Sequence, residues 1–117
     1  MAFKFEDLRV WKLALGLTSK ISQLTQDFPQ NELYVLSSQI RRASDSVALN
    51  IAEGSTGQSN KEFKRFLTIS IRSGIEVIGC LHIGRERGII DEENFRELYN
   101  SYEELIIKIQ ALKKSID

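Results

Sequence analysis

The only histidine and the only cysteine of this chain are the residues best suited to chemistry, and they stand two positions apart, at His82 and Cys80. A thiol nucleophile needs a base within hydrogen-bond reach. Each residue of a helix turns by about 100°, so two positions on one helix diverge by about 200° and cannot form such a pair. We therefore interpret Cys80 as a small buried thiol and His82 as a surface residue.

Metal and phosphate chemistry lack their usual patterns as well. Di-iron four-helix bundles take a Glu-x-x-His pair from each of two helices, whereas Gly79 stands three residues before the single histidine. One cysteine excludes a multi-thiolate zinc site and an internal disulfide. Residues 54–60 contain glycines but no lysine for a phosphate-binding loop. We expect no catalytic residue, no cofactor and no metal, and a protein that is not an enzyme; a site centred on His82 or Glu53 is the remaining catalytic alternative.

Polar residues form a stripe beside the apolar positions of residues 32–54. Arg42 and Glu53 are separated by about 16 Å of axial rise, so they cannot pair along one helix. Each is expected to meet another helix, another subunit or a ligand. Asn50 belongs to the same polar set. A structural network or a solvated face is the simpler interpretation, and a subunit contact is the functional one.

Basic residues gather in the segment 55–90, which carries six basic and three acidic side chains, while residues 91–117 carry four and seven. Clustered cations can contact phosphates, and such binding weakens steeply with salt. Solvated helix faces also carry charge runs, and no aromatic residues for base stacking are interleaved with this one. The candidate nucleic-acid contacts are Arg41, Arg42, Lys61, Lys64, Arg65 and Arg72.

Four stretches with helical periodicity must position these residues. Apolar side chains recur at spacings of three and four, and strand-like alternation is absent. The pattern predicts helices over about 7–28, 32–54, 60–87 and 92–116 within one domain of residues 1–117. Short connections stack such helices antiparallel. The predicted fold is all-α, an up-and-down antiparallel four-helix bundle.

The expected helix ends follow from residue types. Gly54 is expected to be a left-handed cap after the second helix. Ser59 with Glu62 matches a capping box at the start of the third helix. Gly88 should end that helix, and Asp91 should cap the fourth.

The third stretch has apolar positions on two sides, of which one comprises Leu67, Ile71, Ile75 and Ile78. So wide an apolar face predicts more than one packing partner. The candidate subunit-interface residues are Arg42, Asn50, Glu53, Leu67, Ile71, Ile75 and Ile78.

The composition agrees with one soluble domain. The chain has 117 residues, 42% of them hydrophobic, and a formal net charge of zero, so no whole-molecule field attracts nucleic acid or an acidic membrane. Charged residues interrupt the apolar region that an N-terminal secretory signal would need, and no uninterrupted apolar run reaches about 18 residues. We expect a cytoplasmic protein without a membrane partner.

Five short motifs together resemble a known family. In order they are F-E-D-L-R-V-W (5–11), F-P-Q-N-E-L-Y (28–34), S-Q-I-R-R-A (38–43), N-I-A-E-G (50–54) and K-E-F-K-R-F-L (61–67). The chain resembles the four-helix-bundle proteins encoded in intervening sequences of bacterial 23S ribosomal RNA genes. The accessory variability determinant of diversity-generating retroelements is related to that family.

The resemblance implies a small non-enzymatic bundle that assembles as a ring-shaped homopentamer and whose cellular role is unknown. In the related retroelement branch, a basic pentamer binds nucleic acid and the reverse transcriptase. Two functional hypotheses follow. The first is a homo-oligomeric scaffold or interaction protein with an unknown protein partner. The alternative is an accessory subunit that binds RNA or DNA through a basic face of the oligomer.

Overall fold

Four long helices make up the computed structural model of this chain, which describes residues 3–57 and 59–116. At Leu33 and Tyr34 it describes the backbone alone, and residues 1, 2, 58 and 117 of the predicted domain lie outside the described part. The helices are α1 (Arg9–Gln26), α2 (Ser38–Ser55), α3 (Asn60–Glu86) and α4 (Glu92–Ser115). No strand occurs among these residues, which confirms the predicted all-α class.

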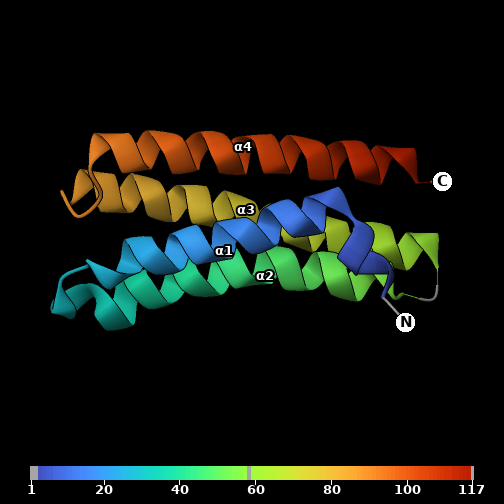
Figure 1. The fold of residues 1–117 in the computed structure, drawn as a ribbon, viewed down its shortest axis with the longest axis horizontal. Helices are drawn as coiled ribbons and strands as arrows, with labels where there is room; N and C mark the ends of the chain where they lie inside the picture. The colour runs from blue at the N-terminus through green and yellow to red at the C-terminus, as the bar shows by residue number, and fades with distance from the viewer. Residues whose placement is uncertain (1–2, 58, 117) are drawn as a thin grey trace.

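Each helix runs opposite to the one before it (Figure 1). Both chain ends therefore lie at one end of the bundle, together with the turn between α2 and α3. The molecule is elongated, with extents of 43 × 25 × 19 Å. This is the up-and-down antiparallel bundle that the four periodic stretches predict.

The first two helices are shorter than the sequence predicts. The residues before α1 form a separate 3-10 turn, η1 (Lys4–Asp7), because Leu8 adopts an extended backbone between the two elements. The segment before α2 consists of a 3-10 turn, η2 (Gln30–Glu32), and a π-helical turn, η3 (Leu33–Ser37). Regular α-helix therefore begins six residues after the predicted start at residue 32.

The core is one continuous cluster made by the apolar stripes of all four helices. Removing these side chains from water is the main favourable contribution to folding. The fully enclosed members include Ile21, Ile40, Val47, Ile51, Leu67, Val77, Leu81, Tyr102, Leu105 and Ile109.

Gly54 does not serve as the left-handed cap that its position suggests. It lies inside α2 and is buried, and Gly88, with φ 71°, is the only glycine with positive φ in the described chain. A Cβ on Gly54 would lie 2.5 Å from the Cβ of Phe66 on α3. The glycine is therefore needed for the close approach of α2 and α3.

The predictions for Gly88 and Asp91 at the helix ends are confirmed. Gly88 follows the end of α3 in the left-handed conformation, and the N–H groups of Ile89 and Ile90 donate back to the carbonyl of Gly84. Asp91 Oδ1 accepts a 2.7 Å hydrogen bond from the backbone N–H of Asn94 at the start of α4.

We predict that Gly54→Ala lowers the free energy of unfolding by about 1–3 kcal/mol, because the added methyl group overpacks the contact with Phe66. Gly16→Ala on α1 is the matched control, since a Cβ there meets nothing within 4 Å; it should raise stability by about 0.5–1 kcal/mol. Urea unfolding of both variants measures the effect. A Gly54→Ala protein as stable as the wild type would contradict the close approach.

Candidate functional site

Of the two side chains best suited to catalysis, Cys80 is held in an unreactive setting and His82 is exposed. Cys80 is buried on α3, and burial raises the pKa of its thiol to about 11, with a smaller contribution from the carboxylate of Glu76. The thiol is therefore protonated at neutral pH and is a poor nucleophile. His82 is exposed on the same helix and packs edge-on against the ring of Phe95, with 5.0 Å between the ring centroids.

The polar groups of the core are paired with one another. Ser44 and Tyr102 share a buried hydrogen bond of 2.7 Å between their hydroxyl oxygens. Burial raises the pKa of Tyr102 to about 12, although the bond with Ser44 acts in the opposite direction. Within the described residues no buried side-chain nitrogen or oxygen lacks a partner. The interior therefore offers no unsatisfied polar group to a substrate.

Metal-ligating side chains do not cluster either: residues 3–57 and 59–116 contain no group of three or more His, Cys, Asp or Glu side chains placed to hold an ion. The expectation that the protein needs no metal remains a prediction.

The predicted polar stripe on α2 is used in part inside the chain. The Asn50 side-chain amide donates to the carbonyl of Ser46 at 2.8 Å and to its hydroxyl at 2.9 Å. That hydroxyl lies 2.8 Å from the hydroxyl of Ser73 on α3, and the Ser70 hydroxyl donates to the carbonyl of Val47 at 2.8 Å. Asn50 therefore belongs to the α2–α3 contact and needs no partner outside the chain.

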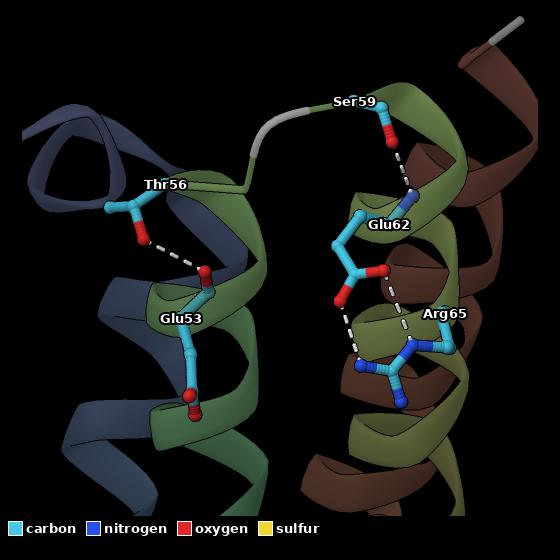
Figure 2. A network of polar contacts seen from close by, with 5 residues as sticks. All are labelled: Glu53, Thr56, Ser59, Glu62 and Arg65. Carbon is cyan, nitrogen blue, oxygen red and sulfur yellow. Dashed lines mark hydrogen bonds and ion pairs between the residues drawn. The ribbon is translucent and has the colours of Figure 1, made fainter.

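The turn between α2 and α3 gathers a small polar network (Figure 2). The Ser59 hydroxyl accepts a hydrogen bond from the backbone N–H of Glu62, as predicted. The Glu62 carboxylate does not reach back to complete the capping box, because it binds the guanidinium of Arg65 at 2.7 Å. This contact lowers the pKa of Glu62 and raises that of Arg65, and Glu53 on α2 adds a smaller upward effect on Arg65.

The two arginines of α2 stay free of acidic partners. Arg41 and Arg42 are exposed, and no ion pair within the described chain involves either of them. Glu53 is exposed too and forms no ion pair with another described residue, so Arg42 and Glu53 are the charged residues of the predicted stripe that remain available to another molecule.

A basic groove lies between α3 and α4 and has a volume of about 580 Å³. Its lining residues are Lys64, Thr68, Ile71, Arg72, Gln110, Lys113 and Lys114. Two of the predicted nucleic-acid contacts, Lys64 and Arg72, therefore meet two lysines from the end of α4. None of these four cations forms an ion pair inside the described chain.

The remaining predicted contacts are not gathered in this groove. Lys61 and Arg65 are exposed on α3, and Arg41 and Arg42 lie on α2. Lys113 and Lys114 were not among the residues predicted from the sequence. Lysines in the last turn of a helix commonly stabilise the helix dipole, so their position there did not indicate a binding site. Their proximity to Lys64 depends on how α3 and α4 pair.

The apolar residues predicted for a subunit interface divide into two groups. Leu67 is 0% exposed, so it belongs to the core of one chain and cannot reach a second one. Ile71 and Ile78 are partly buried and pack against the same core. Ile75, in contrast, is 56% exposed. The second apolar stripe of α3 is therefore mostly covered within the chain, and Ile75 remains outside.

A different set of residues forms the solvent-facing side of α3. We call it the α3 outer face; it comprises Arg72, Ile75, Gly79, Ile83 and Glu86, spaced so that they fall on one side of the helix. Ile83 is 41% exposed, and a Cβ on Gly79 would meet nothing within 4 Å. From the sequence, Ile75 was predicted as an interface residue and Arg72 as a nucleic-acid contact. The other three were not predicted, because the sequence does not tell which apolar side of α3 the bundle covers.

These features define a small all-helical protein of the four-helix-bundle class. A family model of the 23S rRNA-intervening sequence proteins matches residues 6–111. The chain belongs to this family, as the five motifs suggest.

One solved structure is similar over nearly its whole length. It is a protein of unknown function from the S23 ribosomal protein family of Bacteroides thetaiotaomicron VPI-5482, with 26% sequence identity and a TM-score of 0.82. The alignment covers 90% of this chain and 98% of that one. A comparison with curated proteins finds no match.

We predict that native Cys80 reacts with iodoacetamide at pH 8 about 100-fold more slowly than the unfolded chain, because its raised pKa leaves correspondingly less thiolate. The free energy of unfolding should also fall as the pH rises from about 9 to 11, since the unfolded thiol ionises first. Cys80→Ala should reduce that slope. Equal labelling rates in the native and unfolded chains would contradict the assignment.

Proposed function

We propose that this protein is a non-enzymatic, homo-oligomeric scaffold or interaction protein of the cytoplasm. The observation that carries the proposal is the exposure of Ile75 and Ile83 on α3, which are 56% and 41% exposed. An 18-residue window of α3 has a mean hydropathy of 1.4, yet 39% of it is buried within the chain. Apolar area left in water is unfavourable by about 25 cal/mol per Å², so covering it with protein stabilises an assembly.

The residues around this apolar surface suit a protein partner. Ile75 on α3 and Leu49 on α2, which is 64% exposed, lie on two helices that pack against each other. Charges of both signs, among them Arg42 and Glu53, are exposed on α2 as well. An apolar centre with a polar rim is the usual composition of a protein–protein interface.

A lipid bilayer is the other environment that an apolar helix can enter. By length and composition alone, α3 qualifies as a membrane-spanning helix, and core helices of soluble proteins qualify by the same measure. Arg72 and Glu76 are exposed near the middle of α3, and a charged residue at the bilayer centre costs about 2.5–3.5 kcal/mol. These two charged residues therefore favour a protein partner over a membrane.

We take the proposed size of the assembly from the resemblance to the family and not from the single chain. The resemblance implies a ring-shaped homopentamer, and a ring repeats one heterologous contact around its axis. The protonated Cys80 thiol and the fully paired core support the non-enzymatic part of the proposal. A thiol that stays reduced suits the cytoplasm.

We predict that Ile75→Asp disperses the oligomer, because it places a charge in the apolar centre of the interface. Ile107→Asp is the matched control, since Ile107 is 58% exposed but belongs to α4 and not to the α3 outer face; its assembled mass should not change. Light scattering during gel filtration reports the mass, and circular dichroism checks the fold. An Ile75→Asp protein that keeps the wild-type mass would show that another surface joins the subunits.

The basic groove supports a second candidate function, which is binding of the RNA or DNA backbone. Lys64 and Arg72 on α3 line the same hollow as Lys113 and Lys114 on α4. Aromatic residues are missing from the groove-lining set, so contact would be with phosphates and would not read bases. Repetition of the groove in an oligomer would multiply a weak contact.

We predict that Lys64→Ala with Lys113→Ala weakens binding of a labelled 20-nucleotide RNA at low salt by about tenfold or more, as measured by fluorescence anisotropy. A matched control removes two exposed cations of α1, with Arg9→Ala and Lys12→Ala, and should leave the affinity within about twofold. Wild-type binding should also fall steeply with added salt. Salt-independent binding, or equal losses in the two variants, would count against the groove.

A further inference from the structure

The residues of the α3 outer face are arranged symmetrically about a central glycine. The two end residues are both charged, with opposite signs. Gly79 stands at the centre of this face, with Ile75 four residues before it and Ile83 four residues after it. Arg72 precedes the glycine by seven residues and Glu86 follows it by seven. The sequence of properties along the helix is therefore positive, apolar, glycine, apolar, negative.

Gly79 has no role inside its own chain that the structure reveals. It lies in the interior of a 27-residue helix, where glycine is less favourable than alanine. Added side-chain atoms would meet open space, in contrast to Gly54, Gly74 and Gly84, whose Cβ positions are blocked by neighbouring side chains. A glycine without intramolecular need is suited to the close approach of another backbone.

The flanking residues are also without partners in the chain. Ile75 and Ile83 are exposed. Arg72 and Glu86 are exposed too, and neither forms an ion pair with another described residue. The whole stripe is thus available to a second molecule.

We propose that a second copy of this chain packs its α3 antiparallel against this α3, with a two-fold axis passing beside Gly79. In this arrangement Ile75 meets the partner's Ile83, and Arg72 lies at the height of the partner's Glu86. The symmetry repeats both pairs on the other side of the axis. The two glycines meet at the crossing point and let the backbones approach.

The charge pattern indicates that the partner of this face is a second copy of the chain. In a two-fold contact the same surface serves both subunits, so it must be complementary to its own reversed copy. Reversing the direction of α3 exchanges positions 72 and 86, which have opposite charge, and exchanges two isoleucines. Ile75, Gly79 and Ile83 form a ridge with four-residue spacing, the kind of row that interlocks with its equivalent on a facing helix.

This inference rests on the proposed self-association and adds a particular geometry to it. A two-fold contact joins only two chains and cannot close a ring, so with Ile75 in this contact a ring would close through other exposed residues, such as Leu49 on α2. A contact centred on one helix of each chain is smaller than a standard interface. The association through it should therefore depend on protein concentration.

A charge-exchange experiment tests the geometry directly. Arg72→Glu puts like charges opposite each other at both ends of the contact, and Glu86→Arg does the same with the opposite sign. Each single variant should raise the dissociation constant of the two-fold contact by about tenfold or more. The double variant, Arg72→Glu with Glu86→Arg, restores opposite charges and should return the constant to within about threefold of the wild type. Sedimentation velocity over a range of concentrations measures all four proteins.

A second pair of variants tests the glycine crossing. Gly79→Leu favours the helix but fills the space between the two backbones, so it should abolish the two-fold contact while the thermal unfolding temperature stays equal or rises. Gly16→Leu on α1 is the matched control, because its Cβ position is also open; it should leave the contact intact.

The outcomes separate this inference from the proposed function. A wild type that sediments as a single chain at every concentration overturns both. A second outcome is that the wild type is assembled and Ile75→Asp lowers its mass, but the double charge variant associates as weakly as the single variants. This outcome overturns the two-fold geometry alone. A concentration-dependent two-fold contact that survives Gly79→Leu also overturns it. Rescue by the double variant together with loss in Gly79→Leu supports it.

Discussion

The close packing of α2 against α3 is the constraint on which the rest of the molecule depends. Small side chains make it work: Gly54 lets the α2 backbone approach Phe66, and the hydroxyls of Ser46, Ser70 and Ser73 bond across the helix pair. This contact fixes the rotation of α3 about its axis. It therefore decides which apolar side chains enter the core and which stay outside.

Much of the fold could be predicted from the sequence, because periodicity and helix caps are local properties. The positions of Asp91 and Gly88 were sufficient to end one helix and start the next. The role of Gly54 could not be predicted, since a glycine needed for close packing looks the same in sequence as a capping glycine. The hydrogen-bond partner of the Glu62 carboxylate could not be predicted either, because Arg65 competes with the backbone of the cap for this carboxylate.

The candidate surfaces were predicted less well, because each depends on two helices at once. Leu67 and Ile75 look equivalent in the sequence, yet the core encloses the first and leaves the second exposed. The basic groove needs the pairing of α3 with α4 to bring Lys113 to Lys64. Chemistry was easier to judge, since a buried, protonated Cys80 and an exposed His82 agree with the sequence interpretation. The single chain leaves apolar side chains exposed on several elements, and Ile75 and Ile83 are those on α3.

The central claim is that the α3 outer face is covered by other copies of this chain. Light-scattering mass of the untreated protein, measured over a hundredfold range of concentration, tests it most directly. The account predicts a mass that is a multiple of 13.4 kDa and falls on dilution as the weaker contact dissociates. A constant mass of 13.4 kDa over the whole range would contradict it.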